Sequence, residues 1–536
     1  LFCWLAVPLV LGLTYEVFAR YLFHAPTIWA YDVTYMLYGS HFMLGAAYTL
    51  YKGGHIRTDM FYQNWSVRTR GVIDATLYLL LFFPGIALFF WMGLQEALHA
   101  WDIREVSDAS PWRPILYPFP IAFTLIVLSV VFGYIGFGDT VFYLMVFQTI
   151  GLMKEETLAA VPLFIFMGHL LEQAGLMERL FKSFQLILAP LRGSLYLGVL
   201  LTATIFATAT GIIGASVTVM GMMAAPAMIK AGYDPKMSAG TIAAGGTLGI
   251  LIPPSVMLVV MGPIVGVSII KLFAAALLPG LILAFLYIAY TMIRSHIDPS
   301  LGPPLPRDQW ATSFGQIVVE FFSGIVPLAV VIFASLGSII FGLATPTEAA
   351  AMGASGAFLL MVGYRRFSLE KLKQACLNTL ETSSLVLFLA VASNIYGAVF
   401  TRLGTSTMIA EWLLALGLPE TGLLLLLMGV IFLLGWPLEW PAIIFIFLPI
   451  FLPVVESMEV DLLWFSTLVA VNLQTAFLSP PVAMAAYYLR AVAPQWELSS
   501  IYRGMADFMV LQLIGLILVF MFPQIALWLP TVLFGN

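Results

Sequence analysis

Apolar stretches of about twenty residues recur along the whole chain, for example Val72–Met92, Leu272–Met292 and Met509–Leu529. Each is long enough to cross a hydrocarbon core of ~30 Å as a helix. Because hydrophobic residues occupy 61% of the 536 positions and charged residues only 10%, a soluble domain could not bury this surface and the bilayer must serve as solvent. We therefore expect an all-α polytopic membrane protein with roughly fourteen crossings.

The rest of the composition excludes several classes of function. The two cysteines, Cys3 and Cys376, have no disulfide or metal-site spacing, and a net charge of −5 does not suit a nucleic-acid partner. Six histidines scattered along the chain supply no catalytic constellation, so we expect no enzyme. Since no soluble domain interrupts the apolar stretches, a receptor for a substrate would have to be another protein.

Five short matches recur in the same order, at offsets between 224 and 235 residues. They are Glu156-Thr157 with Glu381-Thr382, Gly211 with Gly435, Pro253-Pro254 with Pro480-Pro481, Ser268-Ile269-Ile270-Lys271 with Ser500-Ile501-Tyr502-Arg503, and Gly280-Leu281-Ile282-Leu283 with Gly515-Leu516-Ile517-Leu518. One match would be weak, but five in one order predict that residues 119–300 and 344–525 are two copies of one unit.

The charges in equivalent loops predict that the two copies are inverted. The loops compared are 138–156 with 364–376, 176–193 with 402–420, and 226–240 with 456–461. In each pair one loop is basic and its partner is not, and basic loops favour the cytoplasm. Loops 176–193 and 226–240 are both basic, so the apolar residues between them predict a re-entrant hairpin with its tip near Thr208–Gly211. The second tip is predicted near 435–437.

Two segments cannot continue as regular helices, 245–255 with Pro253-Pro254 and 472–481 with Pro480-Pro481. Paired prolines remove two backbone donors and disfavour helical geometry before them. Proline alone commonly kinks membrane helices, but two breaks at matched repeat positions favour a secondary transporter with a midplane site. Freed carbonyls can coordinate a small cation, and half-helix N-termini can bind an anion.

Three ionisable residues in or beside the predicted spans have alternative interpretations. Glu348 either caps the helix that follows Thr345 or takes part in function. Glu439 either orients the second hairpin tip or serves a cation site. Arg490 pairs with an anionic substrate or extends its side chain to the interface.

Several motifs along the chain carry a resemblance to a known family. They are Val161–Gly168, Leu248–Ser255, Ala344–Ala350, Asn472–Thr475 with Pro480-Pro481, Arg20-Tyr21, Trp29, and Gly54–Asp59. With these motifs the chain resembles the membrane part of tripartite ATP-independent periplasmic (TRAP) transporters. Residues 119–536 resemble the large, M-type subunit and residues 1–118 the small, Q-type subunit. The resemblance implies a fused QM protein of the bacterial inner membrane.

This resemblance also implies sodium-coupled import of a small organic anion, delivered by a periplasmic binding protein, with an elevator movement. Two or more Na⁺ ions would bind at Thr208, Thr210, Gly211, Gly249, Ile252 and Pro254, and at Gly435, Ala476, Ser479 and Val482. Substrate would contact Thr210, Ser216, Gln474, Thr475 and Arg490. Family members often carry glycine and threonine in place of Ala476 and Ser479, so the side chains of the second ion site differ here.

The alternatives are an anion transporter driven by protons or sodium without a binding protein, a channel, and a membrane-embedded enzyme. An internal inverted repeat argues against a channel, which would show oligomeric pore symmetry. The loop charges also leave one crossing missing near Tyr117–Pro120. We expect that a stretch is absent there, or that two segments are joined.

Overall fold

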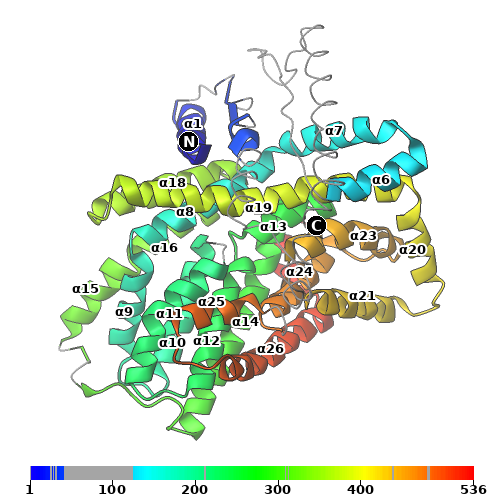
Figure 1. Ribbon diagram of the computed structural model, residues 1–536. Helices are drawn as coiled ribbons and strands as arrows, with labels where there is room; N and C mark the ends of the chain where they lie inside the picture. The colour runs from blue at the N-terminus through cyan, green and yellow to red at the C-terminus, as the bar shows by residue number, and fades with distance from the viewer. Residues whose placement is uncertain are drawn as a thin grey trace, which may run out of the picture. The chain divides into compact units, whose positions relative to one another are not determined.

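A computed structural model describes residues 2–23, 27, 29–30, 33–34, 36–41, 125–210, 213–307, 310–311, 313–436, 440–479 and 483–535. Its secondary structure consists of helices (Figure 1), as predicted. The helices form two compact units. Unit 1 comprises residues 1–162, 376–423 and 441–458, and unit 2 comprises residues 163–375, 424–440 and 459–536.

Unit 1 joins the beginning of the chain to helices from both predicted copies. Its elements are η1 (Phe2–Leu5), α1 (Ala6–Tyr21), α6 (Leu125–Phe137), α7 (Thr140–Met153), η3 (Glu156–Ala159), most of α19 (Leu369–Arg402), α20 (Thr405–Leu414), the π-helix η7 (Ile443–Phe447) and α23 (Leu448–Ser457). The hydroxyl of Tyr38 donates to the carbonyl of Leu152 at 2.8 Å. The ring of His41 lies 3.1 Å from the Ser383 hydroxyl. Residues of the predicted Q-type part therefore bond directly to α7 and α19.

Unit 2 contains both predicted breaks. Its elements are α8 (Ala160–Gln173), α9 (Leu176–Leu188), α10 (Ser194–Thr210), α11 (Ile213–Lys230), α12 (Pro235–Thr247), η4 (Leu248–Ile250), α13 (Val256–Val265), α14 (Ile269–Ile297), α15 (Phe314–Gly324), α16 (Val326–Ile332), the π-helix η6 (Phe333–Gly337), α17 (Ser338–Ile340), α18 (Pro346–Gly363), most of α21 (Glu420–Leu434), α24 (Leu462–Leu473), η8 (Gln474–Phe477), α25 (Met484–Val492), α26 (Leu498–Met521) and α27 (Gln524–Phe534). A short helix, α22 (Trp440–Ala442), lies at the boundary between the units.

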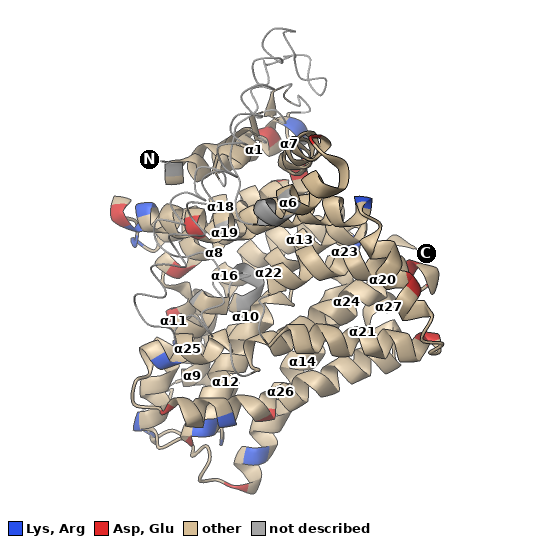
Figure 2. Cartoon of the chain, turned by 45° about the vertical axis from the view of Figure 1, so that its right-hand side comes forward, with Lys and Arg blue, Asp and Glu red and all other residues tan. Residues whose placement is uncertain are grey.

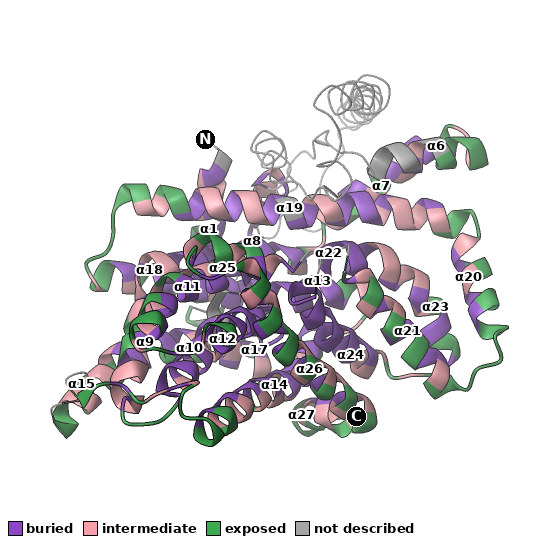
Figure 3. Ribbon diagram, turned by 60° about the horizontal axis from the view of Figure 1, so that its bottom comes forward, coloured by how far each residue is buried: buried purple, intermediate pink, exposed green. Residues whose placement is uncertain are grey.

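The core of unit 2 is built around α12, which is buried from Met237 to Thr247 and coloured accordingly in Figure 3. Its small residues let α10, α11 and α26 pack against it. The closest approach is to α26. A methyl group on Gly504 would lie 1.9 Å from the carbonyl oxygen of Lys236, and one on Gly240 would lie 2.4 Å from the carbonyl oxygen of Gly504. Only glycine fits at this crossing.

Within the described residues, six helices are long and apolar enough to cross a membrane. They are Cys3–Arg20, Ile269–Ile297, Phe314–Ile340, Leu369–Arg402, Trp440–Ser457 and Leu498–Met521. A seventh candidate is the pair Glu156–Gln173 and Leu176–Leu188, which is bent by 59°. Figure 2 shows that large parts of these helices carry no charged residue. The chain is thus a multi-pass membrane protein, and the expected number of crossings also depends on residues outside the described part.

Several sequence predictions of local structure were wrong. The stretch Met509–Leu529 is interrupted, because α26 ends at Met521 and Phe522, which precedes Pro523, leaves the helical region with φ −125° and ψ 77°. The predicted loops 138–156, 176–193 and 402–420 contain the helices α7, α9 and α20. When only hydropathy and charge are considered, these short helices are mistaken for loops that connect the spans.

The two predicted copies have the same order of elements. In the first copy, α8 and α9 precede α10, α11, α12, η4, the break at Pro253-Pro254, α13 and α14. In the second copy, α19 and α20 precede α21, a break, α22 to α23, α24, η8, a second break, α25 and α26. Glycines with left-handed backbone separate the first pair of helices in both copies, Gly175 with φ 71° and Gly404 with φ 75°.

Replacing Gly504 with alanine should destabilise unit 2 by about 2 kcal/mol or more, since the added methyl group collides with backbone rather than with a movable side chain. Thermal unfolding of the purified protein in detergent measures this. The control is Gly429→Ala on α21, where a methyl group meets no atom within 4 Å. Equal melting temperatures of both variants and the wild type would contradict the packing at Gly504.

Candidate functional site

The first break leaves a backbone carbonyl without its helical donor. The helix α12 ends at Thr247, η4 covers Leu248–Ile250, and α13 begins at Val256. In a continuous helix, the carbonyls of Gly249 and Ile250 would accept from the fourth residue onward, but those residues are Pro253 and Pro254, which have no N–H.

The carbonyls of Gly249 and Ile250 differ in their hydrogen bonding. That of Ile250 accepts a hydrogen bond from the Ser255 hydroxyl, which also accepts from Leu258 N at 3.4 Å and so caps α13. The Gly249 carbonyl receives no hydrogen bond from the described residues, although Gly249 is buried. A buried carbonyl without a donor is costly and is a suitable ligand for a hard cation.

The second break repeats this arrangement. In the first copy, the amides of Leu251 and Ile252 donate to the Leu248 carbonyl at 3.1 and 2.9 Å. In the second copy, the amides of Leu478 and Ser479 donate to the Thr475 carbonyl at 3.1 and 2.9 Å. Every partner is displaced by 227 residues. By the same rule, Pro480 and Pro481, which lie outside the described residues, cannot donate to the carbonyls of Ala476 and Phe477.

The helices α10 and α11 pack against η4, which begins the first break. A methyl group on Gly246 would lie 2.4 Å from Cγ2 and 3.2 Å from the backbone N of Val217 on α11, so the two backbones are nearly in contact. Ser216, the neighbour of Val217 and a predicted substrate residue, is buried. In the second copy, a methyl group on Gly435 would lie 3.0 Å from Cβ of Ala476. Gly435 and Ala476, both predicted for one ion site, therefore lie side by side.

Buried amide groups surround the second break. Gln474 is fully buried, and both polar atoms of its side chain have no hydrogen-bond partner among the described residues. Asn472 donates from Nδ2 to the Met428 carbonyl at 2.7 Å, while its Oδ1 has no partner there. Thr475 donates its hydroxyl to the Asn472 carbonyl at 2.7 Å. Unpaired amide atoms at such depth indicate a place for a ligand or water.

Sequence reasoning missed a second polar cluster on α12, α14 and α26. Gln512 and Thr247 are fully buried, with Nε2 of the former 3.5 Å from Oγ1 of the latter. Tyr287 is also fully buried, and its hydroxyl has no partner in the described part of the chain. The amide of Gln512 within the apolar stretch of α26 was the signal of this cluster that the sequence offered. The three side chains come together in one layer only through the packing of the helices.

The ionisable candidates lie in different surroundings. Glu348 completes a capping box, because Thr345 N donates to its carboxylate at 2.8 Å and its own N–H donates to Oγ1 of Thr345 at 3.3 Å. The capping interpretation is confirmed. Arg490 is exposed and donates to the carbonyl of Pro494 at 2.5 Å and to that of Trp496, so it holds the end of α25.

The other predicted site residues are only partly described. Thr208 and Thr210 form the last turn of α10, and their side chains lie outside the described part. The positions that lie wholly outside the described residues are Gly211, Val482 and Glu439, together with the motif Gly54–Asp59 and the junction Tyr117–Pro120. The described site thus comprises Gly249, Ile252, Pro254, Gly435, Ala476, Ser479 and the side chains of Ser216, Gln474, Thr475 and Arg490.

Comparison with known families shows to which family this chain belongs. Residues 114–525 match the DctM component of the tripartite ATP-independent periplasmic transporters, and residues 9–135 match the DctQ component. The chain belongs to the TRAP transporter family and carries its small and large membrane components fused in one polypeptide. The boundary between residues 118 and 119 stays a prediction, since the two matches overlap.

The relatives of this chain include proteins that are named as TRAP transporter permeases. The chain is 29% identical over 381 residues to the C4-dicarboxylate TRAP transporter large permease protein DctM of Pseudomonas aeruginosa, covering 70% of this chain and 87% of that protein. It is 32% identical over 338 residues to the isethionate TRAP transporter permease protein DctMQ of Oleidesulfovibrio alaskensis, covering 62% and 52%.

A third relative extends over nearly the whole chain. This is the sialic acid TRAP transporter permease protein SiaT of Haemophilus influenzae, 24% identical over 602 positions that cover 97% of this chain and 96% of that protein. The alignment is longer than the 536 residues of this chain, so SiaT carries positions that this chain lacks.

One solved structure supports the fold. The YdaH transporter of Alcanivorax borkumensis matches with a TM-score of 0.53 and 16% identity, covering 81% of this chain and 97% of that chain. At this identity the likeness concerns the fold alone.

Replacing Ser255 with alanine should lower stability by about 1–2 kcal/mol, because α13 loses its N-cap and the buried Ile250 carbonyl loses its donor. The matched control is Ser268→Ala, which removes a cap from α14 at an exposed position. Thermal unfolding should show the larger loss at Ser255. A loss no greater than that of the control would show that Ser255 does not hold the break.

Proposed function

We propose that this protein imports a small organic anion, a carboxylate or sulfonate, by secondary transport coupled to sodium. The substrate arrives on a periplasmic binding protein, and the chain resides in the bacterial inner membrane. Relatives named for C4-dicarboxylates, sialic acid and isethionate support the class of substrate, since all are small organic anions. They do not choose between a carboxylate and a sulfonate.

The observation that carries the sodium coupling is the pair of proline-freed carbonyls at equivalent positions of the repeat. One ion binds carbonyls of Gly249, Ile252 and Pro254 together with the tip Thr208–Gly211. The second binds at Gly435 with Ala476, Ser479 and Val482. The backbone of Gly435 against Ala476 supports the second set. Backbone carbonyls are hard, uncharged ligands, which suits a monovalent cation of small radius.

The substrate anion binds between the two ion sites. The N-terminus of α13 offers backbone N–H groups, and the unpaired Nε2 of Gln474 adds a buried donor. Thr475, Ser216 and Thr210 supply hydroxyl groups of the same site. Arg490, the remaining substrate candidate, donates to the carbonyls of Pro494 and Trp496 beyond the end of α25, and its contact with the anion stays a prediction.

An elevator movement is supported by the location of the described site within a single unit. The described ion and substrate candidates belong to unit 2, whereas the described Q-type residues belong to unit 1. The bonds from Tyr38 to α7 and from His41 to α19 make the Q-type part an extension of unit 1. Unit 1 then acts as the fixed scaffold, and the site moves with unit 2.

The test is uptake into proteoliposomes that contain the full chain, with the binding protein encoded beside its gene. Labelled succinate, N-acetylneuraminate and isethionate serve as probes, each loaded on the binding protein. An inward sodium gradient should drive accumulation of one probe, and a potassium gradient should not. Uptake without sodium and without the binding protein would favour the alternative anion transporter and overturn this proposal.

Replacing Pro253 with alanine should remove one sodium site, because the new N–H bonds to the Gly249 carbonyl. The Hill coefficient for sodium should fall from about 2 to about 1, and Pro480→Ala should act in the same way through Ala476. The control is Pro263→Ala inside α13, away from the break. An unchanged Hill coefficient in a correctly folded Pro253→Ala protein would exclude a role for this carbonyl.

A further inference from the structure

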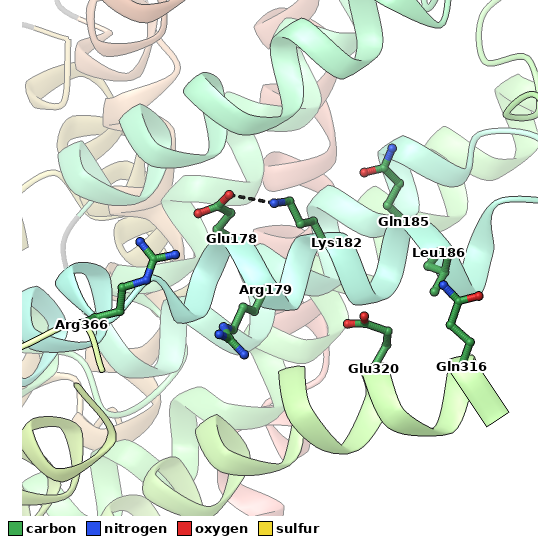
Figure 4. A pocket seen from close by; sticks show the side chains of 8 residues that line it. All are labelled: Glu178, Arg179, Lys182, Gln185, Leu186, Gln316, Glu320 and Arg366. Carbon is green, nitrogen blue, oxygen red and sulfur yellow. Dashed lines mark hydrogen bonds and ion pairs between the residues drawn. The ribbon is translucent and has the colours of Figure 1, made fainter. Parts of the chain in front are cut away.

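A pocket of about 460 Å³ lies between α9 and α15, and none of its residues belongs to the ion or substrate sets. It is lined by Glu178, Arg179, Lys182, Gln185 and Leu186 of α9, by Gln316 and Glu320 of α15, and by Arg366. Figure 4 shows Arg179 and Glu320 between the two helices, with Glu178 and Lys182 on the other side of α9. All of its lining residues belong to unit 2.

The helices α9 and α15 are in close contact beside the pocket. The hydroxyl of Ser183 donates to the backbone carbonyl of Glu320 at 3.0 Å. A methyl group on Gly324 would lie 2.2 Å from that hydroxyl oxygen, so only glycine fits at this contact.

The cationic groups exceed the carboxylates in the pocket. Lys182 pairs with Glu178 at 2.9 Å within α9. The guanidinium of Arg179 lies 4.4 Å from the ring centroid of Tyr364, which orients its plane and leaves the N–H edge available. Neither Arg179 nor Arg366 forms an ion pair within the described part of the chain. Two guanidinium groups in one cleft favour a phosphate group as ligand.

The outer side of α15 is apolar and exposed. Its exposed large side chains are Phe314, Val318, Val319, Phe321 and Phe322. They begin the Phe314–Ile340 span, most of which is not buried in the protein. In a membrane protein such a surface contacts acyl chains. The cleft therefore lies at the end of a lipid-facing span, where a headgroup and its chains can be bound together.

The positive charges near the pocket indicate which leaflet of the bilayer the pocket faces. The basic residues of 176–193 and 226–240 predict that this end of the span faces the cytoplasm. Basic pockets between membrane helices on that side bind acidic headgroups. We propose that the α9–α15 pocket binds the phosphate of an anionic phospholipid from the cytoplasmic leaflet, with Arg179 and Arg366 as its ligands.

The test uses the full-length protein purified in detergent, with bound lipid counted by native mass spectrometry. Dioleoyl phosphatidylglycerol should bind and raise the melting temperature, and dioleoyl phosphatidylcholine should do neither. The double variant Arg179→Gln/Arg366→Gln should weaken phosphatidylglycerol binding by about tenfold or more. The matched control, Lys230→Gln/Lys236→Gln, removes the same charge from the same predicted side without touching the pocket, and should bind as the wild type does.

A variant that gains affinity separates binding from misfolding. Glu320→Gln removes a carboxylate from the pocket and should tighten phosphatidylglycerol binding by about threefold. Equal binding by the wild type and the double arginine variant would overturn the proposal. So would equal binding of phosphatidylglycerol and phosphatidylcholine. If inorganic phosphate stabilises the protein as well as phosphatidylglycerol does, the pocket holds a free anion and the lipid assignment is wrong.

Discussion

The rest of this structure depends on where backbone hydrogen bonds are left unmade. In hydrocarbon every N–H and C=O must find a partner within the protein, which makes helices the default. Pro253 and Pro254 remove two donors, Ser255 compensates for one, and the Gly249 carbonyl remains. Such a carbonyl is tolerated only in a protected interior. The buried helix α12 and its glycine crossing with α26 provide that interior.

The sequence was sufficient to predict the breaks, because proline acts locally and its effect does not depend on the rest of the fold. A capping box is also a local pattern, so helix capping was one of the two interpretations of Glu348. The structure confirms this interpretation. Short helices were harder. The helix α9 carries charges that mark it as a loop, although the left-handed Gly175 starts a new helix there. The layer of Gln512, Thr247 and Tyr287 depends on how three distant helices pack, which no local pattern encodes.

Under the proposed function, the matched breaks explain why one unit can hold both ions and the anion. The hydrogen bonds to the carbonyls of Leu248 and Thr475 have the same lengths in both copies, so a single local geometry is used twice. The helices α11 and α25, which come from different copies, pack together: a methyl group on Gly214 would lie 3.1 Å from the Tyr488 ring. The proposed site, built from two copies within one unit, would then move as a whole, as the proposed elevator movement requires.

Under the proposed coupling, the number of carbonyl sites also constrains the energetics. With both ion sites filled, a monoanion such as isethionate or sialic acid crosses with a net charge of +1. The membrane potential then adds about 2.3 kcal/mol per 100 mV to the driving force. A dicarboxylate crosses without net charge, and only the sodium gradient drives it. Because Gln474 and the N-terminus of α13 would bind either kind of anion through neutral donors, the proposed site itself does not select between these regimes. The charge of the substrate, set by the binding protein, decides whether transport responds to potential.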